Sequence, residues 1–171
     1  MTVTLRLATV DDAPELSRFG AASFIDWYLP DNEPENVYAH VASTYRPERQ
    51  AAEIAEPGQW ALLAHVDGTL AAYAMLRTET PCPEGVTQAD AEIRRFYVGR
   101  EWHGQGLARQ LMQAVLQRGR EAGAKGLWLT CWERNPRALA FYAKSGFSRV
   151  GTAIFTVGND PQTDHLLALD F

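Results

Sequence analysis

The chain has 171 residues, of which 46% are hydrophobic, and a formal net charge of −5. A chain of this length and apolar content can bury a full core, so we expect residues 1–171 to form a single globular domain. Its acidic balance argues against a nucleic-acid-binding domain, which is typically basic. No apolar run approaches the roughly 18 residues of a membrane span, and no basic start precedes a long apolar stretch at the N-terminus. We therefore expect a cytoplasmic protein with neither a membrane span nor a signal peptide.

The N-terminal half is predicted to combine helices with a β-hairpin. Asp67-Gly68 stands between two apolar runs and is a strong hairpin signal, so these runs should be adjacent antiparallel strands. The aromatic and acidic segment 24–30 is predicted to follow the first helix and to end in a turn over residues 31–34. The predicted elements are a strand over residues 2–8, helices over 13–23, 35–45 and 47–55, and strands over 60–66 and 69–77.

The C-terminal half is predicted to contain a strand, a helical crossover and a second, parallel strand. Asn135-Pro136 and Gly146 bound a short helix between them, because Asn caps a helix start and Gly suits a helix end. The predicted elements are a strand over 92–98, a helix over 107–123, a strand over 127–132, a helix over 137–145, and strands over 147–157 and 165–171. This order predicts an α/β fold with a mixed, mostly antiparallel sheet of about seven strands and helices on both faces.

The charges are unevenly distributed along the chain. Residues 1–90 contain five Arg and no Lys against fourteen Asp or Glu, a net charge of −9, whereas residues 91–150 carry +7. A basic block suits a polyanionic ligand, and an acidic block suits a cationic one. Solvated surface on both halves is the alternative explanation.

Residues 92–109 are predicted to be a strand, a glycine-bearing loop and the start of a long helix. Strand alternation would place Glu92, Arg94, Phe96 and Val98 on one side and Ile93, Arg95 and Tyr97 on the other. Two glycines before a helix leave backbone N–H groups free and unobstructed, which favours a phosphate or pyrophosphate ligand. A tight turn without a ligand is the alternative. A dinucleotide fold is disfavoured because Arg109 occupies its third glycine position, and no Gly-Lys-Ser/Thr of a Walker loop follows.

The loop carries a family resemblance. His103-x-x-Gly106-x-Ala108 resembles the Arg/Gln-x-x-Gly-x-Gly/Ala signature of the GNAT superfamily of N-acetyltransferases. A second family motif, Glu133-Arg134-Asn135 followed by Ala140-Phe141-Tyr142-x-x-x-Gly146-Phe147, lies about thirty residues later. The resemblance covers essentially the whole chain and implies the GNAT fold, with acetyl-CoA as cosubstrate. His103 departs from the usual Arg or Gln, but backbone amides make most of this contact in the family.

The resemblance also implies roles for individual residues. Tyr142 would protonate the leaving thiolate, although a packed helix tyrosine is the alternative. Glu92 would act as the base, directly or through water, or would merely pair with an Arg or the substrate. A backbone N–H near Val98 would serve the oxyanion. The implied cosubstrate-binding residues are Phe96, Tyr97, Val98, His103, Gly104, Gln105, Gly106, Leu107, Ala108, Arg109, Asn135, Tyr142 and Lys144.

Three stretches bear on the acceptor. SFIDWYLPDNEPENVYAHV, Trp132-Glu133 and FTVGNDPQTDHLLALDF are similar to bacterial spermidine/spermine N-acetyltransferases of the PaiA type. This similarity implies a small polycationic amine, such as spermidine, that attacks acetyl-CoA directly in a ternary complex. Carboxylates and aromatic rings would bind such an amine by charge neutralisation and cation–π contact. The acceptor-side candidates are Asp26, Trp27, Tyr28, Glu35 and Trp132.

Several alternatives remain open at this point. The acceptor could instead be a protein or peptide amine, or the chain could be a non-catalytic acyl-CoA-binding sensor. A homodimer is one possible oligomeric state. Two cysteines are too few for a disulfide framework or a metal cluster, and the histidines show no metal-ligand spacing, so we expect no metal. Cys131 as a nucleophile is an alternative to a packed strand cysteine.

Overall fold

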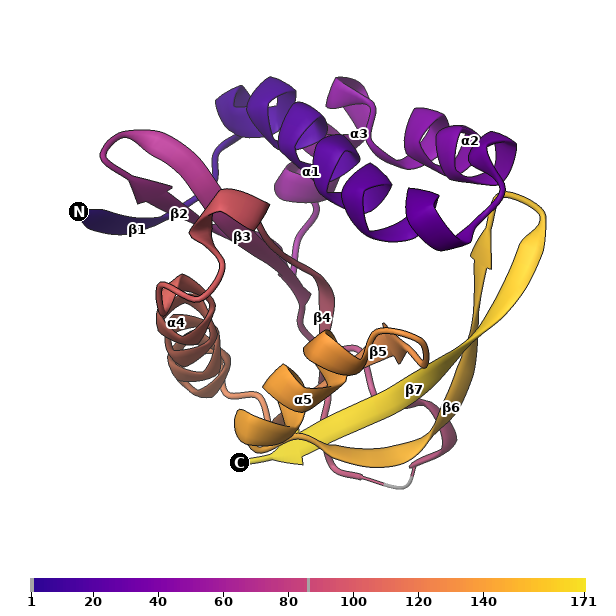
Figure 1. Cartoon of the computed structure of the whole chain (residues 1–171). Coiled ribbons are helices and arrows are strands. Elements are labelled where there is room, and N and C mark those ends of the chain that lie inside the picture. Colours follow the sequence, from indigo (N-terminus) through magenta and orange to yellow (C-terminus); the bar gives the residue numbers. More distant parts are fainter. Residues whose placement is uncertain (1, 86) are drawn as a thin grey trace.

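The computed structural model describes residues 2–85 and 87–171, in which seven strands form one sheet (Figure 1). The strands are β1 (Val3–Leu7), β2 (Gln59–Val66), β3 (Thr69–Arg77), β4 (Ala91–Val98), β5 (Gly126–Trp132), β6 (Ser148–Val157) and β7 (Asp160–Asp170). They lie in the order β1-β2-β3-β4-β5-β7-β6. Neighbours are antiparallel except β4 and β5, which are parallel because a helix crosses over between them. The predicted mixed, mostly antiparallel sheet is confirmed.

Five α-helices in the described part of the chain cover both faces of this sheet. They are α1 (Ala13–Tyr28), α2 (Pro34–Thr44), α3 (Pro47–Ala55), α4 (Leu107–Glu121) and α5 (Pro136–Lys144). Helices α1, α2 and α3 lie on one face, and α4 and α5 lie on the other (Figure 1). Proline begins α2, α3 and α5, where its fixed φ suits a helix and its missing N–H removes no intrahelical bond.

The two faces bury separate apolar cores. Leu107, Leu111 and Val115 are spaced four residues apart on α4, so they share one helix face and pack against β2 to β5. On the opposite face, Leu16 of α1 packs with Tyr73 and other buried residues of β2 and β3. Strand β3 is therefore covered on both sides, and its residues from Leu70 to Leu76 are all buried.

Strands β4 and β5 pair over a very short distance. Ala91 and Glu92 are their only paired positions on β4, opposite Leu127 and Trp128 on β5, within the described residues. Yet β4 continues to Val98 and β5 to Trp132, so the two strands diverge beyond this contact. Backbone groups on the facing edges of both strands are left without a strand partner. This divergence opens the centre of the sheet.

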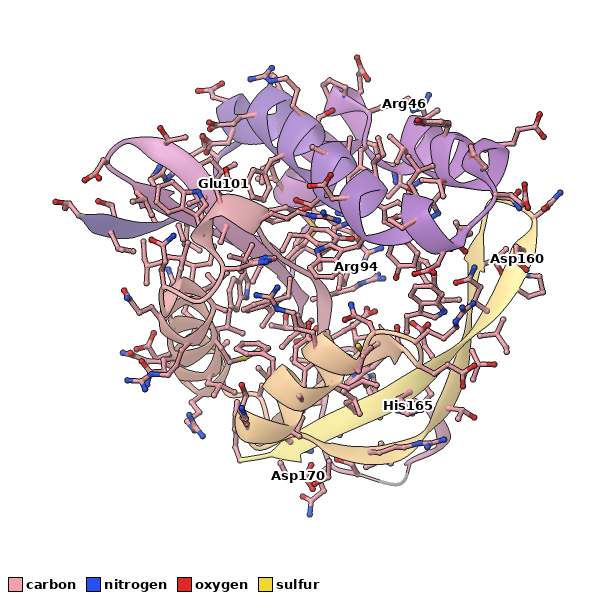
Figure 2. All side chains as sticks on the ribbon, in the orientation of Figure 1. Arg46, Arg94, Glu101, Asp160, His165 and Asp170 are labelled. Atoms are coloured by element: carbon pink, nitrogen blue, oxygen red, sulfur yellow. The ribbon has the colours of Figure 1, made fainter. Side chains whose placement is uncertain are left out.

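A β-bulge in β4 changes which side chains share a face. Arg95 pairs with Met75 and Ile93 pairs with Leu76, so Arg94 is an extra residue in β4 (Figure 2 labels it near the middle of the view). After the bulge the alternation is inverted. Ile93 therefore shares the α4 side with Phe96 and Val98, and Arg95 and Tyr97 face α1 and α3. The predicted grouping of Glu92 with Phe96 and Val98 is wrong.

Two predicted boundaries are also wrong. Helix α1 continues through segment 24–28 because no Pro or Gly interrupts it, and Phe24 and Tyr28, one turn apart, stack their rings at 4.2 Å. Strand β7 begins at Asp160, which Figure 2 labels beside α2, because Gly158-Asn159 alone makes the turn. Pro161 is tolerated there because β7 pairs only with β6 at that point, and pairing with β5 starts at Asp164.

Candidate active site

A cavity of about 440 Å³ lies where β4 and β5 diverge. Its walls come from the second half of β4, the end of β5, the loop before α4, the first turns of α5, the end of α1 and two positions on β6 and β7. The cavity therefore reaches both faces of the sheet through the gap in its centre. Side chains on the α5 side and side chains on the α1 side border the same space.

The open edge of β4 presents backbone groups to this cavity. The Gly99 N–H donates to the Ala71 carbonyl at 2.9 Å, on the β3 side of the strand. Because hydrogen-bonding groups alternate in direction along an antiparallel strand, Tyr97 also faces β3, while the N–H groups of Phe96 and Val98 face the gap. These two amides are donors in the position of a missing strand. An extended ligand with amide groups could pair with them.

The loop before α4 forms a second group of backbone donors. Gly104 and Gly106 have φ of 77° and 82°, a left-handed conformation that other residues adopt only with strain. The first intrahelical bond runs from the Gln110 N–H to the Gly106 carbonyl, and neither a capping side chain nor an acidic residue occupies the first turn. The N–H groups of residues 107–109 consequently remain available to an anion at the positive end of the helix dipole.

His103 and Trp27 connect the loop to α1. The His103 Nε2 lies 2.9 Å from the Val98 carbonyl oxygen and holds the loop against the end of β4. The Trp27 ring lies 5.8 Å from the His103 ring, with Arg100 and Arg137 guanidinium carbons 5.6 and 6.0 Å from it. Trp27 was predicted on the acceptor side. The structure places it against the loop and the start of α5.

Tyr142 lies on α5 at the inner wall of the cavity. It is buried, and its ring packs edge-on against Phe96 at 6.2 Å and Phe147 at 5.9 Å. Burial raises the pKa of its hydroxyl well above the ordinary value, so the phenol keeps its proton at all working pH values. Asn135 caps α5 by accepting a hydrogen bond from the Ala138 N–H at 3.0 Å, and it also borders the cavity.

The α1 side of the cavity is aromatic and contains one carboxylate. The Tyr28 ring stacks on Trp132 at 5.4 Å and lies 6.3 Å from Phe155. Asp164 on β7 is only 3% exposed, and its Oδ1 has no hydrogen-bond partner among the described residues. Burial, with a contribution from the charge of Glu133, raises the pKa of Asp164 to about 6. Asp164 is not among the predicted site residues, because residues 158–161 were predicted to form a turn and the last strand to begin at His165.

The structure brings most of the predicted residues together and leaves six outside. Those that border the cavity are Phe96, Tyr97, Val98, His103, Gly104, Gly106, Ala108, Arg109, Asn135, Tyr142, Trp27, Tyr28 and Trp132. Those that do not are Glu92, Gln105, Leu107, Lys144, Asp26 and Glu35. The positions of these six residues in the fold explain why they do not border the cavity.

Each of these six residues has other surroundings. Glu92 lies before the bulge with its Oε2 4.0 Å from Arg94, and burial raises the pKa of its carboxyl. Leu107 packs into the core, and the Gln105 amide donates to the Glu101 carbonyl. Lys144 ends α5. Asp26 pairs with Arg100 at 3.5 Å, and Glu35 borders a separate hollow between α2 and the β6–β7 turn.

The surroundings of Cys131 and the arrangement of possible metal ligands bear on two further kinds of chemistry. Burial and the nearby Asp164 raise the pKa of the Cys131 thiol to about 12, which keeps it protonated and inert. Within residues 2–85 and 87–171, no group of three or more His, Cys, Asp or Glu side chains is arranged to hold a metal ion. Among the same residues, the helices are too short or too polar for a bilayer crossing.

Residues 21–147 match the model of the acetyltransferase (GNAT) family. The chain belongs to the GNAT family. An uncharacterized N-acetyltransferase from the pepI 3' region of Lactobacillus delbrueckii subsp. lactis is 35% identical over 156 residues, covering 91% of this chain and 90% of that protein. An uncharacterized N-acetyltransferase of Mycobacterium tuberculosis (strain ATCC 25618 / H37Rv) is 32% identical over 156 residues, covering 91% and 96%. This GNAT protein is an acyltransferase.

Solved structures agree with the GNAT fold. The crystal structure of a PaiA N-acetyltransferase from Thermoplasma acidophilum in complex with coenzyme A has a TM-score of 0.82 at 19% identity, covering 100% of both chains. The ribosomal-protein-S18-alanine N-acetyltransferase from Escherichia coli has a TM-score of 0.68 at 19% identity, covering 99% of this chain and 94% of that one. Its membership of the acetyltransferase (GNAT) family makes acetyl-CoA the cosubstrate of this enzyme. The free amides of β4 and the uncapped start of α4 fit its pantetheine amides and its pyrophosphate.

Proposed function

We propose that this enzyme transfers the acetyl group of acetyl-CoA to the primary amine of a small molecule, by direct attack in a ternary complex. One observation carries the proposal: the cavity joins the glycine loop and the open edge of β4 to an aromatic, carboxylate-bearing end on the opposite face of the sheet. Two ligands can enter such a space from different faces and meet in the gap. The protonated Cys131 offers no acyl-enzyme route, which supports direct transfer.

The residues of the cavity match the requirements of this reaction. Bound acetyl-CoA would supply the acetyl group as a thioester. One of the two N–H groups of Phe96 and Val98 can donate to a carbonyl oxygen whose negative charge grows in the transition state, and the other can pair with a pantetheine amide. The uncapped N–H groups of residues 107–109 can bind the pyrophosphate. Tyr142 would hold the proton that the leaving sulfur needs.

A small polycationic amine such as spermidine is the acceptor class we propose to test first. A polyamine needs more than one negative partner, and Glu133 lies close enough to Asp164 for its charge to raise the pKa of that carboxyl. One ammonium group could bind at each carboxylate, with aromatic rings beside the chain. Asp26 and Glu35 lie outside the cavity and have no part in this arrangement. Because its cosubstrate is acetyl-CoA, we also propose a cytoplasmic location.

The proposal is tested by following thiol release from acetyl-CoA with the purified protein. The acceptors are spermidine, spermine, small aliphatic and aromatic monoamines, and a peptide with a free N-terminus. Saturable release with the polyamines, and a mass increase of one acetyl group in the product, is the expected result. Release with monoamines alone would replace the polyamine with a singly charged acceptor, and release with the peptide alone would replace it with a protein amine. No release with any of them, despite tight binding of acetyl-CoA, would contradict the proposed function.

A further inference from the structure

We propose that the Asp164 carboxylate binds the ammonium group of the acceptor and takes its proton before acetyl transfer. This inference rests on the proposed function and assigns the acceptor subsite within it. Among the described residues that border the cavity, Asp164 is the only carboxylate. Four arginines border the same space, so it is the one strongly attractive place for a cation there.

The position of Asp164 suits a ligand more than a structural role. It lies opposite Trp132 of β5 and Ala153 of β6, in the only part of β7 that faces the open end of the gap. A nearly fully buried carboxylate is normally paired with a cation or with several hydrogen-bond donors. Here no arginine or lysine forms an ion pair with it within residues 2–85 and 87–171, and its Oδ1 has no hydrogen-bond partner there. A bound ammonium group would satisfy that oxygen.

The aromatic rings beside Asp164 add a second attraction for a cation. Trp132 is its cross-strand neighbour, and Tyr28 stacks on Trp132 at 5.4 Å. Phe155 lies 6.3 Å from Tyr28 on the other flank of the cavity. Ring faces attract ammonium groups, and this attraction is stronger where water is excluded. A buried carboxylate flanked by rings is thus selective for a positively charged nitrogen.

Two groups beside Asp164 keep their protons in the neutral range. Burial raises the pKa of Tyr28 on α1 and of Cys131 on β5, so both stay protonated. The charge of Glu133, just after β5, raises the pKa of Asp164, whereas the hydrogen bond with the Thr130 hydroxyl lowers it. Arg137 on α5 also borders the cavity. Burial raises the pKa of Asp164 to about 6, so we expect ionisation of this carboxyl to affect acceptor use near neutral pH.

The step balances as follows in protons and bonds. The ammonium group gives one proton to Asp164, and the neutral nitrogen then bonds to the acetyl carbonyl carbon as the carbon–sulfur bond breaks. Tyr142 gives its proton to the departing sulfur. The nitrogen loses a second proton as the amide forms, which restores the Tyr142 hydroxyl, and Asp164 releases its proton to solvent. One amine and one thioester thereby give one amide and one thiol.

The test compares the Asp164→Asn variant with the wild type, using the best acceptor from the thiol-release screen. We expect kcat/KM for the acceptor to fall at least about a hundredfold, while affinity for acetyl-CoA, measured by calorimetry, changes less than about twofold. In the wild type, kcat/KM should rise with pH through about 6, because only the ionised carboxylate can bind and deprotonate the ammonium group. This rise of kcat/KM with pH should be absent from the Asp164→Asn variant. With acceptors whose amines are less basic, the rise in kcat/KM that is due to Asp164 should stay at the same pH. The transition that is due to the amine itself should shift with the pKa of that amine.

Stability serves as an internal check on folding. The folded-state pKa of Asp164 lies above the ordinary value of about 4, so its contribution to stability is present below pH 4 and is lost as the pH rises through about 6. Removing the charge should thus raise Tm slightly at pH 7.

Asp160→Asn, on the same strand but exposed, is the matched control and should keep wild-type kinetics. Asp164→Asn with turnover within threefold of the wild type and the same pH limb would overturn the inference, and the proposed function would stand. A wild type without amine turnover would instead overturn the proposed function and this inference with it.

Discussion

Tyr142→Phe is expected to lower kcat by about a hundredfold, with the affinity for acetyl-CoA changed less than about threefold. The substitution removes only the hydroxyl, so the ring contacts with Phe96 and Phe147 remain. What is lost is the proton for the departing sulfur. Stopped-flow or steady-state measurement of thiol release at saturating acceptor and acetyl-CoA gives kcat, and calorimetry gives the affinity.

The raised pKa of Tyr142 does not argue against this role. A phenol is a weaker acid than a thiol in water, with ordinary pKa values of about 10 and 8.5. The low dielectric that raises the pKa of the phenol also raises that of a thiolate formed beside it, because both anions lose hydration. The proton can therefore move as the carbon–sulfur bond breaks. Because Tyr142 stays protonated, its ionisation should cause no change in the wild-type rate between pH 6 and 9.

A buried tyrosine outside the cavity separates chemistry from packing. Tyr45 is buried, and its hydroxyl lies 2.8 Å from the Tyr97 hydroxyl. Tyr45→Phe should cost about 1 kcal/mol of stability for the lost hydrogen bond and leave kcat unchanged. If Tyr142→Phe behaved in the same way, with full turnover, Tyr142 would be a packed helix residue and the sulfur would take its proton from another source.

Glu53→Ala is expected to reduce the free energy of unfolding by about 3 to 5 kcal/mol. Glu53 on α3 contacts Arg95 on β4 through two hydrogen bonds, of 2.5 and 3.2 Å, and both side chains are buried. Removing the carboxylate would leave the Arg95 charge buried without its partner, which costs far more than the pair itself contributes. Chemical denaturation monitored by far-UV circular dichroism measures the change.

An exposed ion pair gives the matched control. Arg77 and Glu56 lie 3.3 Å apart with about 45% of each side chain exposed. Arg77→Ala should cost less than about 1 kcal/mol, because solvent screens this pair. A cost for Glu53→Ala as small as that of the control would mean that Arg95 finds another partner or water. Since Arg95 follows the bulge in β4, loss of its anchor should also weaken acetyl-CoA binding.

The order of the elements could be predicted from the sequence because local signals set it. Asp67-Gly68 dictated the β2–β3 hairpin, and Asn135-Pro136 with Gly146 bounded α5 to within one residue. Gly104 and Gly106 marked the loop that precedes α4, and their left-handed φ values follow from the turn they make. Each of these signals acts within a few residues, so no tertiary information was needed.

The geometry of the site could not be predicted in the same way, because it depends on contacts between distant segments. The bulge at Arg94 arises from pairing with β3, and it moves Glu92 away from the face of Phe96. Asp164 reaches the cavity only because β7 starts early and pairs with Trp132. Residues 160–165 are Asp, Pro, Gln, Thr, Asp and His, so no hydrophobic alternation in the sequence extended the last strand to Asp164.

In the binding mode that we propose, acetyl-CoA lies along the open edge of β4 and at the start of α4. Residue-resolved amide hydrogen exchange by NMR, with and without CoA, tests it most directly. We expect increased protection of the Phe96 and Val98 amides and of the amides of residues 107–109, because each would donate to the ligand. The Tyr97 amide, which faces β3, should change little. Protection confined to other segments, with the Phe96 and Val98 amides unaffected at saturating CoA, would contradict binding of acetyl-CoA along the edge of β4.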